Sequence, residues 1–219
     1  MSKHRMGETI YTPNQPSTQL FLIVEGRVKV SRHGGGGEVV VDLYQADEFF
    51  GESALVGCDS RGERAVAMAY TRVMKWSREE IEENALLRPE LALALLQLMA
   101  RRTADFEGRI QSLSNESVTR RLTRALIRFA AKFGIQEGDG TLAMPTLTHE
   151  LLSKYVGTSR EIVTHHMNQF RRDGYLSYSR DGISLYKRAL SEWGAGAPAV
   201  TAESAHAGSG KTQLDAIVV

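Results

Sequence analysis

Residues 146–186 read TLTHELLSKYVGTSREIVTHHMNQFRRDGYLSYSRDGISLY, and they carry the clearest structural signal in the chain. Apolar residues recur at helical spacing on both sides of Gly157, which predicts two short amphipathic helices joined by a tight turn. Thr148 can cap the first helix, and Thr158-Ser159-Arg160-Glu161 has the spacing of a capping box that opens the second. A hairpin turning at Asp181–Gly182 follows. The pattern predicts a helix-turn-helix with a β-hairpin wing.

The second of these helices has one apolar and one polar face. Val163, Met167 and Phe170 fall on the inward face. The outward residues are Arg160, Glu161, Thr164, His165 and Asn168. Arginine can donate two hydrogen bonds to guanine, glutamate can accept one from cytosine, and the amides at the helix start with the Ser159 hydroxyl can hold phosphate. The composition therefore predicts a DNA-reading face; the alternative is an ordinary solvated face.

Charge is distributed unevenly along a chain whose net charge is only +1. Residues 101–190 hold 15 Lys and Arg against nine Asp and Glu, whereas residues 1–100 carry more acidic than basic side chains. A basic C-terminal part predicts a polyanionic partner, and double-stranded DNA fits the polar helix face.

Composition excludes several classes of protein. With 42% hydrophobic residues the chain can form a core. No apolar run approaches the ~20 residues of a membrane span, and the first residues lack the apolar segment of a signal peptide. The single cysteine, Cys58, excludes an internal disulfide. These features predict a cytoplasmic protein without membrane contact.

The first eighty residues contain short runs typical of β-strands. The expected strands are Thr9–Tyr11, Leu20–Val24, Arg27–Arg32, Val39–Tyr44 and Ala65–Ala69. The four glycines at 34–37 mark a hairpin tip. Short strands at this spacing predict a closed or double-sheet antiparallel architecture.

Two longer helices are expected between the strands and the helix-turn-helix. The first runs from Pro89 to about Leu113, and the second runs from Val118 to Phe133. We interpret the first as a dimerisation helix; the alternative is packing entirely within its own subunit. The expected dimer positions are Leu95, Met99, Phe106, Ile110 and Leu113.

Residues 156–186 resemble the winged helix-turn-helix of the Crp/Fnr family, named after the cyclic-AMP receptor and the fumarate–nitrate regulator. VEGRVKVS, YQADEFFGESALVG and GERAVAMA in the first half resemble the family's β-roll and phosphate-binding cassette. The resemblance implies an α+β fold that acts as a homodimer on DNA and contacts RNA polymerase. The expected parts are a β-roll sensor (1–86), a dimerisation helix (87–114), a winged helix-turn-helix (115–190) and a disordered Ala/Gly/Ser-rich tail (191–219).

The resemblance also implies roles on DNA. By alignment with the cyclic-AMP receptor, Arg160, Glu161 and His165 occupy base-reading positions, the third of which is arginine in that protein. This implies an inverted repeat of half-sites that resemble TGTGA. The residues expected to make backbone or secondary contacts are Thr148, Thr158, Ser159, Thr164 and Asn168.

By the same resemblance, the phosphate-binding cassette consists of Gly51, Glu52, Arg64 and Ala65. In such a cassette the glycine admits a phosphate, the carboxylate holds a ribose hydroxyl and the arginine neutralises the phosphate. Three departures speak against a cyclic nucleotide. The glutamate–arginine stretch is longer than in cyclic-AMP-binding members, Ala65 replaces Ser or Thr, and Phe106 and Glu107 replace adenine-contacting hydroxyls. Cyclic AMP, another small ligand and no effector stay open, as does a purely structural role for Gly51 and Glu52.

Two other functions compete with a DNA-binding regulator. A cyclic-nucleotide-binding module without DNA contact leaves the polar helix face unexplained. A cupin-like metal enzyme needs a histidine and carboxylate cluster, but the first hundred residues hold only His4 and His33. Residues 205–212 match a relaxed phosphate-loop pattern but lack the flanking strand and helix. We therefore expect no catalytic and no metal-ligating residues.

Overall fold

The computed structural model describes residues 1–194. The expected disordered tail, apart from its first four residues, and the phosphate-loop pattern lie outside the described residues. The chain divides into two compact units, Met1–Glu116 and a second that begins at Ser117. The long helix thus belongs with the strands of the first unit.

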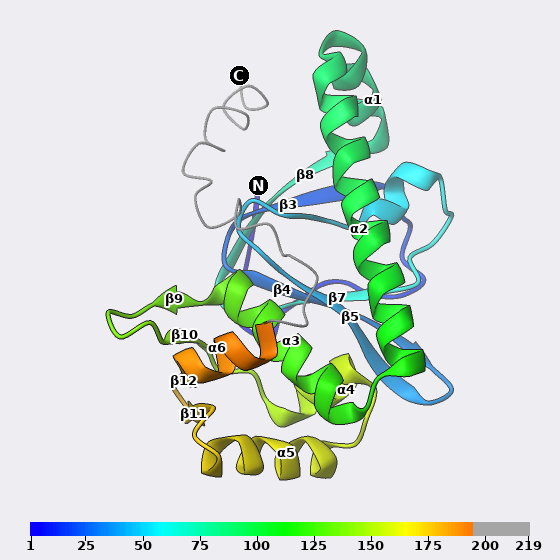
Figure 1. Cartoon of the computed structure of the whole chain (residues 1–219). Helices are drawn as coiled ribbons and strands as arrows, with labels where there is room; N and C mark the ends of the chain where they lie inside the picture. The colour runs from blue at the N-terminus through cyan, green and yellow to red at the C-terminus, as the bar shows by residue number, and fades with distance from the viewer. Residues whose placement is uncertain (195–219) are drawn as a thin grey trace. The chain divides into compact units, whose positions relative to one another are not determined.

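Two four-stranded antiparallel sheets form the roll of the first unit (Figure 1). Their strand orders are β1-β8-β3-β6 and β2-β7-β4-β5. The strands are β1 Ser2–His4, β2 Thr9–Tyr11, β3 Gln19–Glu25, β4 Arg27–Gly34, β5 Gly37–Gln45, β6 Phe49–Phe50, β7 Arg64–Ala67 and β8 Thr71–Ser77. The glycine hairpin joins β4 to β5, as predicted, and the double-sheet expectation is confirmed.

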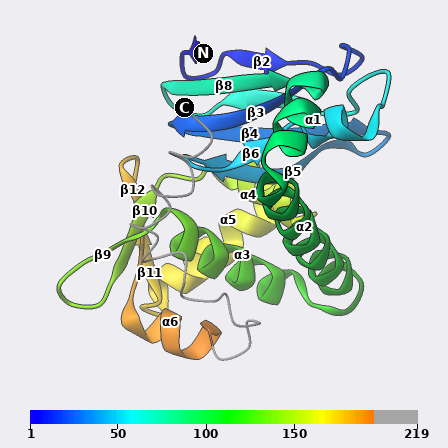
Figure 2. The same cartoon turned by 90° about the horizontal axis from the view of Figure 1, so that it is seen from above.

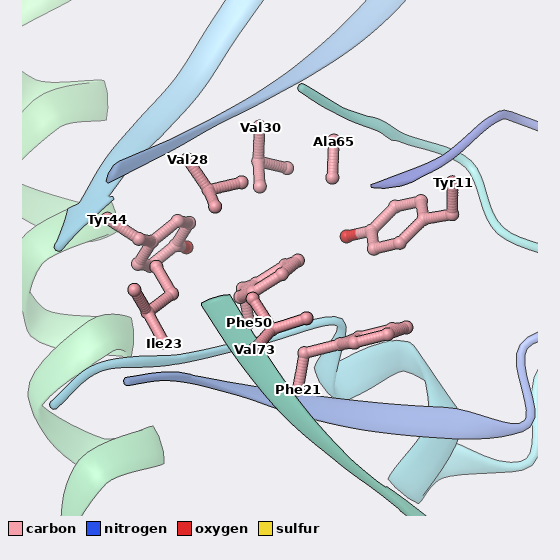
Figure 3. Close-up of a cluster of buried hydrophobic side chains, with 9 residues drawn as sticks. All are labelled: Tyr11, Phe21, Ile23, Val28, Val30, Tyr44, Phe50, Ala65 and Val73. Atoms are coloured by element: carbon pink, nitrogen blue, oxygen red, sulfur yellow. The ribbon is translucent and has the colours of Figure 1, made fainter. Parts of the chain in front are cut away.

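The interior of the roll is filled largely by aromatic rings (Figure 3). The rings of Phe21 and Phe50 stack with centroids 5.0 Å apart, and Tyr11 and Tyr44 flank Phe50. Val28, Val30, Ala65 and other small side chains close the cluster. Burial of this apolar surface is the main force that holds the two sheets together.

Helix α1, Arg78–Leu87, follows β8, and α2, Pro89–Asn115, follows α1 (Figure 2). Ser77 and Glu80 form a reciprocal capping box at the start of α1. Pro89 lies in the first turn of α2, as predicted, where its missing N–H has no cost.

The second unit combines helices with a small sheet of order β11-β12-β10-β9 (Figure 1). The elements are α3 Val118–Phe133, β9 Ile135–Gln136, β10 Leu142–Pro145, α4 His149–Val156, α5 Arg160–Arg172, β11 Leu176–Tyr178, β12 Gly182–Leu185 and α6 Lys187–Gly194. Leu122, Leu126 and Phe129 of α3 are fully buried, as are Leu152 of α4 and Met167 of α5. Their packing fixes the helix-turn-helix on α3.

Several elements differ from the sequence prediction. Strand β8 was not expected, and it pairs with both β1 and β3. The segment after Gly134, expected as a loop, forms the β9–β10 hairpin. Helix α6 extends to Gly194 and therefore crosses the expected boundary at residue 190. Trp193 explains the extension, because its ring packs 4.8 Å from Phe170 and 5.0 Å from Tyr175, measured between centroids.

Candidate DNA-reading helix and effector cassette

The turn between α4 and α5 has the expected geometry, but its cap differs from the prediction. Gly157 ends α4 with φ of 74°, in the left-handed region that favours glycine. Ser159, and not Thr158, is the N-cap of α5, and its hydroxyl accepts a hydrogen bond from the Ile162 amide at 3.3 Å. The predicted capping box of Thr158 with Glu161 is therefore wrong, because the helix begins one residue later.

Helix α5 presents its polar face to solvent. Arg160, Glu161 and His165 are exposed, whereas Val163 and Met167 are completely buried. Hydrogen bonds with its own backbone amide and with Ser159 hold the pKa of Glu161 below its usual value. Glu161 is thus a carboxylate at neutral pH and can accept a hydrogen bond from a cytosine amino group.

The expected backbone-contacting residues are held by neighbours. Thr148 caps α4 by accepting from the Leu151 amide at 3.1 Å. The Thr164 hydroxyl donates to the Arg160 carbonyl at 2.9 Å and lies 2.9 Å from His149 Nδ1. The backbone amide of Thr158, a half-buried residue, donates to the Ser153 carbonyl at 3.1 Å. These threonines have structural roles that are compatible with a DNA contact.

In the roll, the cassette starts at Gly51, which caps the 3-10 helix η1, Glu52–Val56, with φ of 82°. Glu52 is ion-paired with Arg102 of α2, with 2.9 Å between Oε1 and Nη1. Arg102 also donates to the Phe49 carbonyl, and its guanidinium lies 4.8 Å from the ring centre of Tyr44. The Glu52 carboxylate was expected to hold a ribose hydroxyl. It is instead already paired with an arginine of the same chain, Arg102.

The arginine buried in the cassette is Arg61, which the sequence analysis did not single out. Arg61 is 3% exposed, donates to the Gln19 carbonyl at 2.5 Å and stacks over Tyr11 at 4.1 Å. Its Nη1 would lie 2.9 Å from a Cβ added to Gly51. Arg64, by contrast, is exposed and donates to the Thr9 hydroxyl at 2.8 Å. Ala65 is buried in the core of the roll.

A second buried charge accompanies Arg61. Glu63 is 7% exposed, accepts from the Ser53 hydroxyl at 3.2 Å and contacts Arg32 at 3.3 Å. Burial, with Glu63 as the next cause, raises the pKa of the Tyr11 hydroxyl. The Glu63 carboxylate is therefore already held by Ser53 and Arg32.

Helix α2 carries both half-buried and exposed apolar side chains. Leu91, Leu95 and Leu98 are half-buried in their own unit, as are Arg102 and Arg109. Arg109 donates to the carbonyls of Val41 and Val40 at 2.5 and 2.6 Å. Other large apolar side chains of α2 are exposed. They are Leu93, Leu96, Phe106, Ile110 and Leu113.

Of the expected dimer positions, Phe106, Ile110 and Leu113 are therefore exposed, whereas Leu95 and Met99 are half-buried within the subunit.

Comparison with known proteins agrees with this architecture. The family model of the cyclic nucleotide-binding domain matches residues 2–85, and that of the Crp-like helix-turn-helix domain matches residues 120–190. The Global nitrogen regulator of Synechococcus elongatus is 30% identical over 183 residues, which cover 82% of this chain and 82% of that protein. The chain belongs to the Crp/Fnr family.

Other members of the Crp/Fnr family are similar along most of the chain. The CRP-like cAMP-activated global transcriptional regulator of Mycobacterium tuberculosis is 28% identical over 171 residues, or 78% of this chain and 76% of that one. A CRP/FNR-family regulator from Thermus thermophilus matches with a TM-score of 0.73 at 25% identity, covering 90% and 99% of the two chains. FixK2 from Bradyrhizobium japonicum shares the fold with a TM-score of 0.76 at 19% identity, covering 91% and 98%.

The protein is thus a DNA-binding transcription regulator with a cyclic nucleotide-binding domain and a Crp-like helix-turn-helix domain. Its relatives are regulators and not enzymes, which removes the support for a cupin-like enzyme. Within residues 1–194, no group of three or more His, Cys, Asp or Glu side chains is placed to hold a metal ion. In the same range, no helix has the length and apolarity needed to cross a membrane.

Sequence reasoning also missed a residue that supports the Crp/Fnr helix-turn-helix. Arg121 of α3 donates through Nε to the Val156 carbonyl at 3.1 Å and through Nη2 to the Gly157 carbonyl at 3.3 Å. It thereby binds the C-terminal carbonyls of α4, which have no partner within their own helix. Basic residues are frequent on α3, and only the structure shows which one reaches the turn.

The stability of the second unit is expected to fall when the protein is acidified from pH 7.5 to pH 5.5. Burial, followed by the charge of Arg160, lowers the pKa of His149; burial, followed by His165, lowers that of His166. The unfolded state, with a histidine pKa of ~6.5, then binds more protons than the folded state. The stabilisation is complete above about pH 6.5 and is lost as the pH falls through the folded-state values.

Differential scanning calorimetry at several pH values measures this effect. The His149→Gln variant keeps a donor toward Thr164 but cannot titrate, so its unfolding temperature should fall less on acidification. His33→Gln, at an exposed position of the first unit, is the matched control. An equal acid sensitivity of wild type and His149→Gln would contradict the assignment to His149.

Proposed function

We propose that the protein regulates transcription as a homodimer that binds an inverted repeat of TGTGA-like half-sites. The observation that carries this is the exposed pair of Arg160 and ionised Glu161 at the start of α5. Arg160 would donate to a guanine, and Glu161 would accept from the cytosine opposite. His165 is shorter than arginine and offers fewer hydrogen-bond donors, so discrimination at its base pair is looser.

The homodimer is supported by the exposed apolar side chains of α2. Leu96, Phe106, Ile110 and Leu113 project from a single helix, and a second copy would bury them in a two-fold, self-complementary contact. Two-fold symmetry then requires half-sites about one helical turn, ~34 Å, apart. From such a site the regulator would contact RNA polymerase.

Selection of DNA from a random-sequence pool, followed by mobility-shift titration, tests the proposed site. We expect the selected duplexes to contain two inverted TGTGA-like half-sites, and we expect a duplex with one half-site to bind more weakly. Selection of an unrelated sequence, or of an unrepeated one, would reject the proposed base contacts.

We further propose that DNA binding by this regulator requires no cyclic nucleotide. Glu52 is paired with Arg102, and Arg64, the arginine expected to neutralise a phosphate, is exposed and donates to Thr9. The residues of the roll therefore do not fit a cyclic nucleotide. The name of the M. tuberculosis relative records activation by cAMP, which makes cAMP the first ligand to test.

Addition of cyclic AMP or cyclic GMP at micromolar concentration is expected to leave the DNA affinity nearly unchanged. A ligand without differential affinity for two states shifts no equilibrium between them. Mobility-shift titrations with and without nucleotide measure the effect. A tightening of about tenfold, or ~1.4 kcal/mol, would overturn the proposal, and its loss in Glu52→Ala or Arg64→Ala would place the nucleotide in the cassette.

A further inference from the structure

Strand β11 of the wing packs against α5 (Figure 1). It contacts the C-terminal part of the polar face of α5. The Tyr178 hydroxyl donates to Asn168 Oδ1 at 2.9 Å, and Arg171 Nη2 donates to the same oxygen at 3.2 Å. A guanidinium can only donate hydrogen bonds, so the Asn168 atom that faces it must be the oxygen. This contact fixes the orientation of the amide.

The ring that supplies the hydroxyl is itself held on two sides. The His149 ring packs edge-on against Tyr178 with centroids 5.2 Å apart, and the Arg171 guanidinium lies over the Tyr178 ring at 5.2 Å. Tyr178 is half-buried, and it also lines a cavity of about 390 Å³ at the base of the wing together with Thr148, His149 and Met167. The hydroxyl thus has a fixed position relative to α5.

His149 also fixes the neighbouring residue on the reading face. The Thr164 hydroxyl donates its one proton to the Arg160 carbonyl, so it accepts from His149 Nδ1. His149 therefore connects the start of α4 both to Thr164 and to the ring of Tyr178. The same set of contacts positions two successive turns of α5.

These contacts determine which hydrogen bonds Asn168 can make with DNA. An amide oxygen has two lone pairs, and here both are used, by Tyr178 and Arg171. Asparagine recognises adenine by donating and accepting at the same time. With its oxygen occupied, Asn168 retains only its NH₂ group, and a lone donor suits a phosphate oxygen, which carries no sequence information.

We propose that Tyr178 is a positioning residue that, with Arg171, presents Asn168 to DNA as a hydrogen-bond donor to the phosphate backbone. Asn168 then fixes the register of the helix on the duplex without selecting a base. This inference rests on the proposed function, because it requires α5 to lie against DNA.

A double-mutant cycle on the full-length protein tests the inference. Asn168→Ala is expected to weaken binding about tenfold per half-site, the low end for a hydrogen bond to a charged group, for selected and random duplexes alike. Tyr178→Phe keeps the ring but removes the hydroxyl, and we expect an equal or smaller loss. In the Asn168→Ala background, Tyr178→Phe should cause no further loss, because the two act through one contact.

Tyr175→Phe is the matched control, since the Tyr175 hydroxyl donates to Glu192 at 2.6 Å on the side of α6. It should leave the DNA affinity unchanged.

A full effect of Tyr178→Phe in the Asn168→Ala background, or an equal effect of Tyr175→Phe, would overturn the positioning role. A changed base preference in Asn168→Ala would overturn the phosphate assignment. If the wild-type protein selects no DNA sequence, the base contacts of the proposed function are rejected. If it does select a sequence but the affinity losses of Asn168→Ala and Tyr178→Phe add up, only the positioning role of Tyr178 is rejected.

Discussion

Replacement of Arg160 by alanine is expected to weaken binding to the selected inverted repeat by about 1–3 kcal/mol per half-site. Arg160 is exposed at the first position of α5, where its guanidinium can donate two hydrogen bonds to one guanine. Loss of both leaves the guanine acceptors without a partner. Because a dimer reads two half-sites, the two losses combine, and preference at one base pair of each half-site should relax.

Arg172→Ala is the matched control for Arg160→Ala. Arg172 is an exposed arginine in the last turn of the same helix. If it contacts DNA, it contacts phosphate, so its loss should weaken all sequences alike and flatten the dependence of affinity on salt. Mobility-shift titrations on selected and random duplexes separate the two behaviours. Equal losses on both duplexes for Arg160→Ala would show that Arg160 binds phosphate and would contradict the TGTGA assignment.

Substitution of Ile110 by glutamate is expected to convert the dimer to monomers and to reduce DNA affinity together with it. Ile110 of α2 is 64% exposed, so the change leaves the interior of the subunit intact. In a two-fold contact it would bring two carboxylates into one apolar seam, which is strongly unfavourable. Phe106→Glu should act in the same direction. Multi-angle light scattering measures the mass, and the mobility shift measures the affinity.

The control for this substitution is Ile135→Glu on β9, where the isoleucine is 76% exposed in the second unit. It introduces the same charge at an equally exposed apolar side chain and should leave both mass and affinity unchanged. A dimeric Ile110→Glu variant would place the subunit contact elsewhere.

The helix-turn-helix could be predicted closely from local chemistry. The predicted bounds of α3, Val118–Phe133, agree with the structure, because a serine cap and a glycine stop lie at its ends. Val163, Met167 and Phe170 are buried as their spacing predicts. The missed strand β8 carries a period-two signal, since Thr71 and Val73 are buried between less buried residues. The two-residue strands β6 and β9 are too short to give any periodic signal.

The cassette could not be predicted in the same way. Arg61 and Arg64 both follow a loop without regular spacing, and the register of β7 on β4 decides that Arg64 points outward. In α2, apolar residues three or four apart fit two different stripes. The roll half-buries Leu91, Leu95 and Leu98 and leaves Ile110 exposed. The orientation of Arg64 and the burial of the α2 residues both depend on contacts between segments that are far apart in the sequence.

The way in which α2 is attached to the roll has a consequence for how the sequence of the roll can diverge. Arg102 and Arg109 bind main-chain carbonyls of Phe49, Val40 and Val41. Every amino acid supplies a carbonyl, so substitutions at these three positions leave the acceptors in place. Side chains at these three positions can therefore change, by natural drift or by design, without removing these hydrogen bonds to the helix. For these main-chain contacts, selection needs to preserve the two arginines and the path of the backbone that offers the carbonyls.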